Sequence, residues 1–300
     1  MATEDLHSSR RFNLADGFIV AVDKPKGWSS FHVVKKLRGA LLARARHAGI
    51  RKLKVGHAGT LDPLASGVMI ICSGKATKMI DRLQSGVKEY VAEIQLGATT
   101  PSFDLETPVD ATFPTGHITR ELIDEVLPRF IGTIQQVPPV YSAVKVDGLR
   151  AYMAVRLGQE VELKPKTLVI DEIELLGFDP ESMKLTARIV CSKGTYIRAL
   201  ARDIGEALGS GAHLTELRRT RVGDFNLANT LAIDDAVDDI YLSEITVPKG
   251  DGEPPQIIPP APHGPDRAKP DPDRHDIMTY AERAAAGLAT PPPATTSSPE

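Results

Sequence analysis

The sequence has few cysteines and few aromatic residues, and it has no long apolar run. Its 300 residues include 2 cysteines and 1 tryptophan, and aromatic residues make up 5% of them. Cys72 and Cys191 each stand in an apolar run without metal-ligand spacing, so we expect reduced core thiols and no metal site. The apolar run 68–72 is too short to span a bilayer, and the N-terminal residues show no apolar secretion signal. We therefore expect a cytoplasmic protein without membrane contact.

Acidic residues are missing from one long basic segment. Residues 24–61 contain ten Lys or Arg and no Asp or Glu, and residues 214–221 form a second basic cluster. Residues 231–300 hold 13 acidic and 5 basic residues, so the net charge of −3 divides into −8 there and +5 over residues 1–230. A solvated helix face normally mixes both signs, so a run of one sign predicts a polyanionic partner.

The C-terminal region differs in composition from the rest. Residues 248–300 contain 13 prolines and few large apolar residues, and such a segment buries too little surface to offset the entropy of ordering it. We predict a disordered N-terminus over 1–16, one folded domain over 17–242, and a Pro-rich, acidic, disordered tail over 243–300. The tail shows no evident C-terminal RNA-binding domain.

Hydrophobic periodicity predicts the fold class. The alternation over 88–96 indicates a half-buried strand with Tyr90 on its apolar face. Helical spacing of apolar residues predicts one helix whose buried stripe begins at Phe31 and a second helix after Gly194, in which Arg198 lies off the stripe. Several predicted strands are joined by short turns instead of helices, which indicates an α+β fold with a mixed, mainly antiparallel sheet. The predicted strands are 17–22, 68–72, 88–96, 131–137, 141–146, 167–176 and 185–191.

The segment 56–67, GHAGTLDPLASG, carries the main chemical candidate. Its glycines permit positive φ and close approach of a ligand, and Pro63 disfavours the helical region for Asp62. Asp62 should therefore project from a stiff turn. An ordinary Asx turn is the structural alternative for a single Asp-Pro pair.

Other sites are excluded by spacing. Residues 74–77, GKAT, lack the first glycine and the Ser/Thr of a phosphate-binding loop. His47 and His57 have no third ligand at zinc-site spacing, and no GxSxG motif supports acyl transfer. One carboxylate on a glycine-rich turn, two basic clusters and a tyrosine at a strand entry remain.

These features resemble the bacterial tRNA pseudouridine synthases that act on the T-loop uridine, position 55 of tRNA. Five segments match in order between residues 17 and 224: DKPKGWSSF, GHAGTLDPLASG, KEYVAEIQLG, PPVYSAVKVDG and CSKGTYIRALARDIGEALGSGAHLTELRR. The resemblance implies the pseudouridine-synthase fold with a central cleft, an isomerase activity on the T arm of tRNA, and no cofactor. We expect a monomer.

The resemblance also implies roles for individual residues. Asp62 matches the nucleophile, with Arg198 and Tyr90 as its catalytic neighbours, and Tyr90, His57, Tyr196 and Leu217 match positions that contact the target base or nearby RNA. The basic clusters predict phosphate contacts by Lys24, Lys35, Lys36, Arg51, Lys52, Lys54, Lys145, Arg218 and Arg219.

The chemistry suits these residue types. Pseudouridine formation breaks the N1–C1′ bond and joins C5 to C1′ without gain or loss of atoms. An ionised carboxylate can hold the sugar or the base while the base turns, and a nearby arginine would keep Asp62 charged. A catalytically silent tRNA-binding or folding chaperone, and a synthase for another RNA, are the alternatives.

Overall fold

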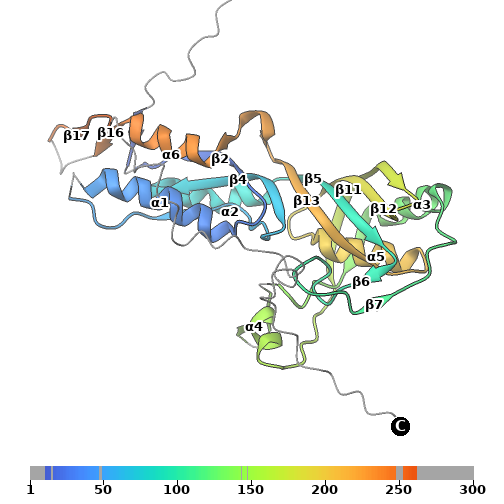
Figure 1. Cartoon of the computed structure of the whole chain (residues 1–300). Helices are drawn as coiled ribbons and strands as arrows, with labels where there is room; N and C mark the ends of the chain where they lie inside the picture. The colour runs from blue at the N-terminus through green and yellow to red at the C-terminus, as the bar shows by residue number, and fades with distance from the viewer. Residues whose placement is uncertain are drawn as a thin grey trace, which may run out of the picture.

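The computed structural model describes residues 11–14, 16–46, 49–142, 144–146, 148–247 and 253–261. The molecule is elongated, with α1, α2 and α6 around one end of a large sheet and α3 and α5 around the other (Figure 1). The helices are α1 (Ser30–Arg46), α2 (Ile80–Ser85), α3 (Arg120–Val126), α4 (Ala151–Arg156), α5 (Ile197–Ala207) and α6 (Ile233–Leu242), with short 3-10 turns η1 (Gly74–Met79), η2 (Leu127–Phe130) and η3 (Leu227–Asn229). No helix among the described residues is long and apolar enough to cross a membrane.

The large sheet has ten strands and confirms the predicted mixed, mainly antiparallel α+β architecture. Within it only β4–β13 and β2–β15 pair in parallel, and the other neighbours are antiparallel. The strand order is β15 (Leu231–Ala232), β2 (Ile19–Lys24), β4 (Ala65–Ser73), β13 (Ala212–Val222), β5 (Lys88–Leu96), β12 (Lys184–Cys191), β11 (Lys166–Asp179) and β8 (Gly132–Gln136), while β3 (Val55–His57) pairs with β4 and β14 (Phe225–Asn226) pairs with β13.

A short parallel contact joins the two halves of this sheet. Only three residue pairs connect β4 and β13, at Leu217–Ala65, Arg218–Ser66 and Arg219–Gly67. Gly67 has φ 103°, and a Cβ there would lie 2.2 Å from the Arg219 carbonyl oxygen. Only glycine allows this approach. The turn that carries Asp62 therefore ends where the two halves of the sheet meet.

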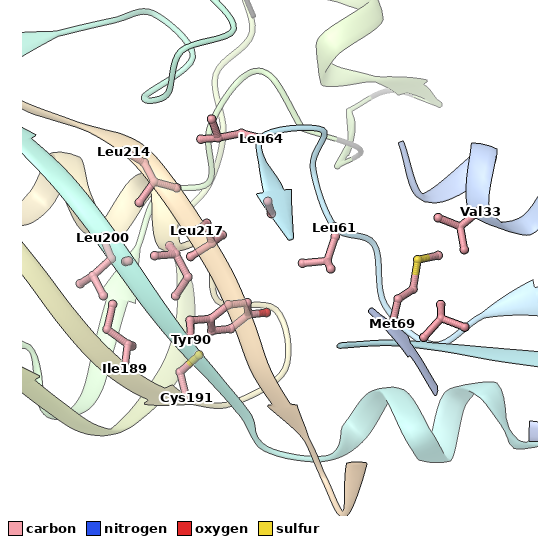
Figure 2. Packing of buried hydrophobic residues seen from close by; sticks show 14 of the residues in the cluster. Val33, Leu61, Leu64, Met69, Tyr90, Ile189, Cys191, Leu200, Leu214 and Leu217 are labelled. Carbon is pink, nitrogen blue, oxygen red and sulfur yellow. The ribbon is translucent and has the colours of Figure 1, made fainter. Parts of the chain in front are cut away.

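The periodicity of the sequence accounts for the packing of β5 and α5. Alternate residues of β5 are buried, including Tyr90, as predicted. The apolar stripe of α5 is also buried, and Leu200 of that helix lies near Ile189 of β12 (Figure 2). The second basic cluster was not recognised as a strand, and it forms β13 at the centre of the sheet.

Helix α1 differs from the prediction in its buried face. It continues through Arg46, so its second half carries part of the basic segment 24–61. Val33, Leu37 and Leu41 are fully buried, so the core stripe does not begin at Phe31, which is 70% exposed. The prediction placed Phe31 on the buried stripe because it is apolar, but Phe31 lies on the opposite side of the helix from Val33, while Leu37 and Leu41 are buried as expected.

Three strands outside the large sheet overturn part of the predicted disorder. Strand β16 (Glu244–Val247) lies between β1 (Arg11–Asn13) and β17 (Gln256–Ile258). Ile245 is fully buried, and Arg44 of α1 donates hydrogen bonds to the Ser243 and Pro259 carbonyls at 2.8 and 2.7 Å. The prolines in this region obscured strands of three or four residues. Residues 1–10 and 262–300, which belong to the predicted disordered segments, lie outside the described residues.

Two further strand pairs complete the described architecture. Strand β6 (Ala98–Thr99) pairs with β7 (Ala111–Thr112), and β9 (Lys145–Val146) pairs with β10 (Leu149–Arg150). The predicted strand over 141–146 is therefore confined to its last two residues.

The C-terminal strands should contribute to global stability. Replacing the buried Ile245 with Ala is expected to lower the free energy of unfolding by about 2–4 kcal/mol, because the change leaves a cavity. Ile257 of β17 is 56% exposed, so Ile257→Ala should change it by less than about 0.5 kcal/mol. Urea denaturation of both variants measures the difference. Equal, small effects would show that β16 does not belong to the core.

Candidate active site

A cavity of about 560 Å³ lies at the junction of β4, β5, β13 and the start of α5. Its wall includes the turn residues 59–62 and residues from loops on the other side of the junction. The charged residues of the wall are mainly basic: Lys88, Lys166, Lys193, Arg198 and Arg219, against Asp62 and Glu106. The cavity is therefore suited to an anionic ligand.

The turn that carries Asp62 is held on both sides by the segment before α1. Ser30 Oγ donates to the Leu61 carbonyl at 2.9 Å and accepts from the Leu61 N–H at 2.8 Å. The Gly27 N–H donates to the Pro63 carbonyl at 2.8 Å. These contacts fix the backbone on each side of Asp62, whose side chain is 39% exposed. The predicted display of one carboxylate on a stiff turn is observed.

Arg198 is the predicted partner of Asp62, and the structure brings the two together. Its Nε lies 2.9 Å from Asp62 Oδ2 and 3.5 Å from Asp104 Oδ2. Its Nη1 and Nη2 donate to the Ser102 and Tyr141 carbonyls, each at 3.0 Å. The two terminal nitrogens are thus hydrogen-bonded, while Nε lies within ion-pair distance of both carboxylates without a hydrogen bond of good geometry. Burial lowers the pKa of Arg198, but the charges of Asp62 and Asp104 offset this, and the pKa lies above its ordinary value.

Asp104 is the site residue that sequence reasoning missed. No motif in the sequence pointed to it, and its side chain is buried beside Arg198. Asp104 Oδ1 accepts from Ser102 Oγ at 2.6 Å and from the Glu106 N–H at 2.9 Å. Burial raises the pKa of Asp104, although the charge of Arg198 and the Ser102 hydrogen bond act in the opposite direction. The close spacing of Ser102, Asp104 and Thr107 was the available signal, because such residues fold a loop on itself.

Tyr90 and Leu217 form an apolar part of the cavity wall. Figure 2 shows the Tyr90 ring near Leu217, with its hydroxyl directed toward the side of Leu61. Tyr90 is opposite Arg219 in the β5–β13 register. Burial raises the pKa of Tyr90, and the charge of Arg219 lowers it to a smaller extent. Both residues were predicted to meet the base, and both line the same space as Asp62.

Tyr196 also lines the cavity, at the entry to α5. The buried Gln136 side chain accepts from the Tyr196 N–H at 2.9 Å and donates to the Tyr196 carbonyl at 3.2 Å. This double contact fixes the backbone two residues before Arg198. Burial raises the pKa of the Tyr196 phenol.

Two predicted phosphate ligands have structural roles. Arg219 is buried and donates to the carbonyls of Val68 at 2.7 Å, Gly59 at 3.2 Å and Thr60 at 3.4 Å. Lys24 is fully buried, and its Nζ donates to the carbonyls of Pro25 at 3.0 Å and Trp28 at 2.6 Å. Arg219 thus holds the turn that carries Asp62, and Lys24 holds the segment before α1; their burial speaks against the predicted phosphate contact, which stays a prediction.

The other predicted basic residues divide by exposure. Arg51, Lys52 and Lys54 are exposed in the loop before β3, and Lys35 is exposed on α1. Lys36 pairs with Asp234 at 2.6 Å and Arg218 with Asp23 at 2.7 Å. The Lys145 side chain lies outside the described part of the structure.

His57 is not in the cavity wall. It lies in β3, and its Nδ1 is buried without a hydrogen-bond partner among the described residues. Burial lowers the pKa of His57, and the charge of Arg219 acts in the same direction, against the backbone of Gly59.

Comparison with known proteins assigns this site to a family. Residues 46–197 match the model of the TruB family pseudouridylate synthase N-terminal domain, and residues 198–249 match the tRNA pseudouridylate synthase B C-terminal domain. The chain belongs to the TruB family of pseudouridylate synthases. These enzymes are isomerases that modify RNA. The second match covers a segment in which no C-terminal domain had been recognised from the sequence.

Curated relatives cover most of the described chain. The tRNA pseudouridine synthase B of Phocaeicola vulgatus is 63% identical over 222 residues, which span 74% of this chain and 92% of that protein. The Mycobacterium bovis protein of the same name is 44% identical over 227 residues, with shares of 75% and 73%.

Solved structures show the same fold. The crystal structure of a Cbf5-Nop10-Gar1 complex contains a chain with TM-score 0.56 and 32% identity, and the match covers 75% of this chain and 55% of that chain. The structure of an H/ACA RNP bound to a substrate RNA containing 2′-deoxyuridine has TM-score 0.53 and 30% identity, with 75% and 53% covered. This chain thus spans about half the length of those solved chains.

The burial of Lys24 predicts a pH effect on stability. Burial lowers the pKa of Lys24 to about 8, although the charge of Asp62 raises it. Between pH 8 and 10 the unfolded chain holds this proton while the folded chain has lost it, so the free energy of unfolding rises with pH. From pH 8 to pH 10 the unfolding free energy of the wild type should therefore rise by about 2 kcal/mol relative to that of Lys24→Met.

Denaturant titrations at pH 7.5, 8.5, 9.5 and 10 measure this difference, and the subtraction removes other titrating groups. A difference that does not change with pH would contradict the buried environment of Lys24.

Proposed function

We propose that this chain isomerises the T-loop uridine of tRNA, at position 55, to pseudouridine, with Asp62 as the nucleophile. The observation that carries the proposal is the Asp62–Arg198 ion pair of 2.9 Å at the wall of a largely basic cavity. The relatives named tRNA pseudouridine synthase B support tRNA as the substrate. The reaction needs no redox or group-carrying cofactor because the product is an isomer of the substrate.

Asp62 supplies the covalent step. The N1–C1′ bond of the uridine breaks, the uracil turns, and C5 bonds to C1′, while the proton on C5 leaves and N1 gains one. The Asp62 carboxylate forms a bond either to C1′ of the sugar or to the base, and that bond keeps the two parts together during the turn. Both routes end with release of the carboxylate, so Asp62 is regenerated. Arg198, 2.9 Å from Asp62 Oδ2, holds the carboxylate at the cavity wall.

The target base must leave its stack before it reaches Asp62. The cavity volume of about 560 Å³ is in the range of sites that enclose a small ligand. Tyr90 offers a ring for stacking and Leu217 an apolar contact, and Tyr196 completes that part of the wall. Such stacking contributes about 1–3 kcal/mol per base.

Tyr90 has a second role in the proposal. Its raised pKa keeps the phenol protonated at neutral pH, so its ring acts first as a surface for the base. To accept the C5 proton late in the reaction, the phenol must first lose its own proton to solvent, and the charge of the facing Arg219 lowers the cost of that loss. Phosphate contacts come from the exposed basic residues Lys35, Arg51, Lys52 and Lys54. His57 contacts the RNA near the target base from its position in β3.

The central experiment uses purified protein and unmodified tRNA transcript. Pseudouridine is mapped by chemical probing after incubation, and we expect one modified position in the T loop. Asp62→Asn should abolish turnover and leave the affinity for tRNA within about twofold, because the isosteric amide cannot act as the nucleophile. Asp124→Asn on α3, where the carboxylate is about half exposed and is not part of the cavity wall, serves as the matched control and should retain full turnover.

The outcomes separate the alternatives. A chaperone would bind tRNA and give no pseudouridine with the wild-type protein. A product at another position or in another RNA would overturn the assigned specificity. Turnover by Asp62→Asn at a measurable fraction of the wild-type rate would remove Asp62 from its assigned role.

A further inference from the structure

Helix α1 presents an exposed aromatic and basic stripe that the reaction does not use. Phe31 is 70% exposed, the most exposed of the large hydrophobic residues described. Lys35, Arg38 and Arg46 follow it at helical spacing and are also exposed. No acidic residue occurs in α1. An exposed aromatic ring followed by basic residues on one helix face is the combination that binds single-stranded nucleic acid, through stacking and phosphate contacts.

The stripe begins beside the catalytic turn. Phe31 follows Ser30 directly, and Ser30 Oγ makes two hydrogen bonds with the backbone of Leu61, the neighbour of Asp62. The helix then runs away from the cavity to the C-terminal strands, where Arg44 binds the Ser243 and Pro259 carbonyls. The distance along the axis from Phe31 to Arg46 is about 22 Å at 1.5 Å per residue. A strand that leaves the cavity can therefore follow the helix for several nucleotides.

The aspartates of the neighbouring helix α6 restrict the RNA-binding surface to the side of α1 that carries the stripe. Helix α6 has four aspartates, and its Asp234 pairs with Lys36 at 2.6 Å. Phe31 and Lys36 are five residues apart, which places them about 140° apart around the helix. The stripe thus faces away from the acidic helix, and phosphates on it are separated from those aspartates.

We propose that Phe31 stacks on an unpaired base of the RNA next to the flipped uridine, and that Arg38 and Arg46 bind the phosphates that follow. The inference deepens the proposed function and rests on it for the identity of the RNA. It adds a contact surface outside the cavity, which positions the strand and does not touch the reacting atoms. Phe31 is therefore a positioning residue.

Affinity for a T-arm RNA hairpin, measured by fluorescence anisotropy, tests the role of Phe31. Phe31→Ala and Phe31→Leu should each weaken binding about 5-fold or more, which corresponds to the loss of one stacked base. Phe31→Tyr keeps the ring and should bind within twofold of the wild type. Equal weakening by Ala and Leu separates stacking from simple apolar contact. Because Phe31 is exposed, melting temperatures of these variants should match that of the wild type.

Salt dependence tests the basic residues. Arg38→Gln and Arg46→Gln should each reduce the slope of log affinity against log salt concentration by about 0.7 to 0.9, the value for one lost phosphate contact. Arg129→Gln is the matched control, since that cation is exposed, pairs with Glu125 and follows α3 at the other end of the molecule. Its slope should stay unchanged.

Turnover of the same RNA separates this inference from the proposed function. Weakened binding by Phe31→Ala, with wild-type turnover at saturating RNA, supports the stripe. Wild-type affinity and salt slope in all variants would overturn the stripe and leave the proposed function intact. If the wild type binds the hairpin through Phe31 but forms no pseudouridine, the proposed function fails and the contact surface stands. A wild-type protein that binds no hairpin overturns both.

Discussion

The buried guanidinium of Arg198 connects the separate parts of the site. It comes from α5 in one half of the sheet and lies 2.9 Å from Asp62, whose turn leads into β4 in the other half. A charged group with this little exposure must have partners on all sides, since an unpaired buried charge costs several kcal/mol. Two carboxylates and two carbonyls meet that need. The requirement to satisfy one cation therefore positions the Asp62 turn, the loop of Asp104 and the segment at Tyr141 relative to one another.

Other buried cations support the same turn from behind. Arg219 binds three carbonyls along residues 59–68, and Lys24 binds two in the segment before α1. These contacts replace a continuous sheet at the place where β4 and β13 share only three residue pairs. Arg219 of β13 thus adds contacts across the junction to β4 and to the Asp62 turn, while Lys24 holds the segment before α1. These contacts make the turn of Asp62 rigid. A rigid turn favours a nucleophile because the reacting geometry is fixed before the substrate binds.

The sequence predicted what depends on local pattern. The alternation of β5, the Asp-Pro turn and the placement of Tyr90, Leu217 and Arg198 at one site agree with the structure, with the family resemblance supplying the link between distant segments. Patterns gave no information on where long side chains end, so Lys24 and Arg219 were taken for phosphate ligands. Asp104 was missed because its burial results from a loop that folds on itself. The strands near Ile245 were missed because prolines dominate the composition around them.

Helix α1 also shows the difference between what the sequence pattern predicts and what only the structure reveals. Its residues were recognised as a basic helix, but only the structure shows that Val33 faces the core while Phe31 faces outward. The helix then links the catalytic turn at one end to the C-terminal strands at the other. A surface that leads from the cavity along this helix is a consequence of the fold and cannot be read from the charge count alone.

The geometry of Arg198, and not merely its charge, holds Asp62 in place. Single-turnover conversion of T-arm RNA by Arg198→Lys tests this claim directly. Lysine keeps the positive charge but offers one ammonium in place of a planar fork, so it cannot reach Asp62 and both carbonyls together. We expect the rate of the chemical step to fall at least about 100-fold, with RNA affinity within about twofold of the wild type. A rate close to that of the wild type would show that the positive charge alone is sufficient.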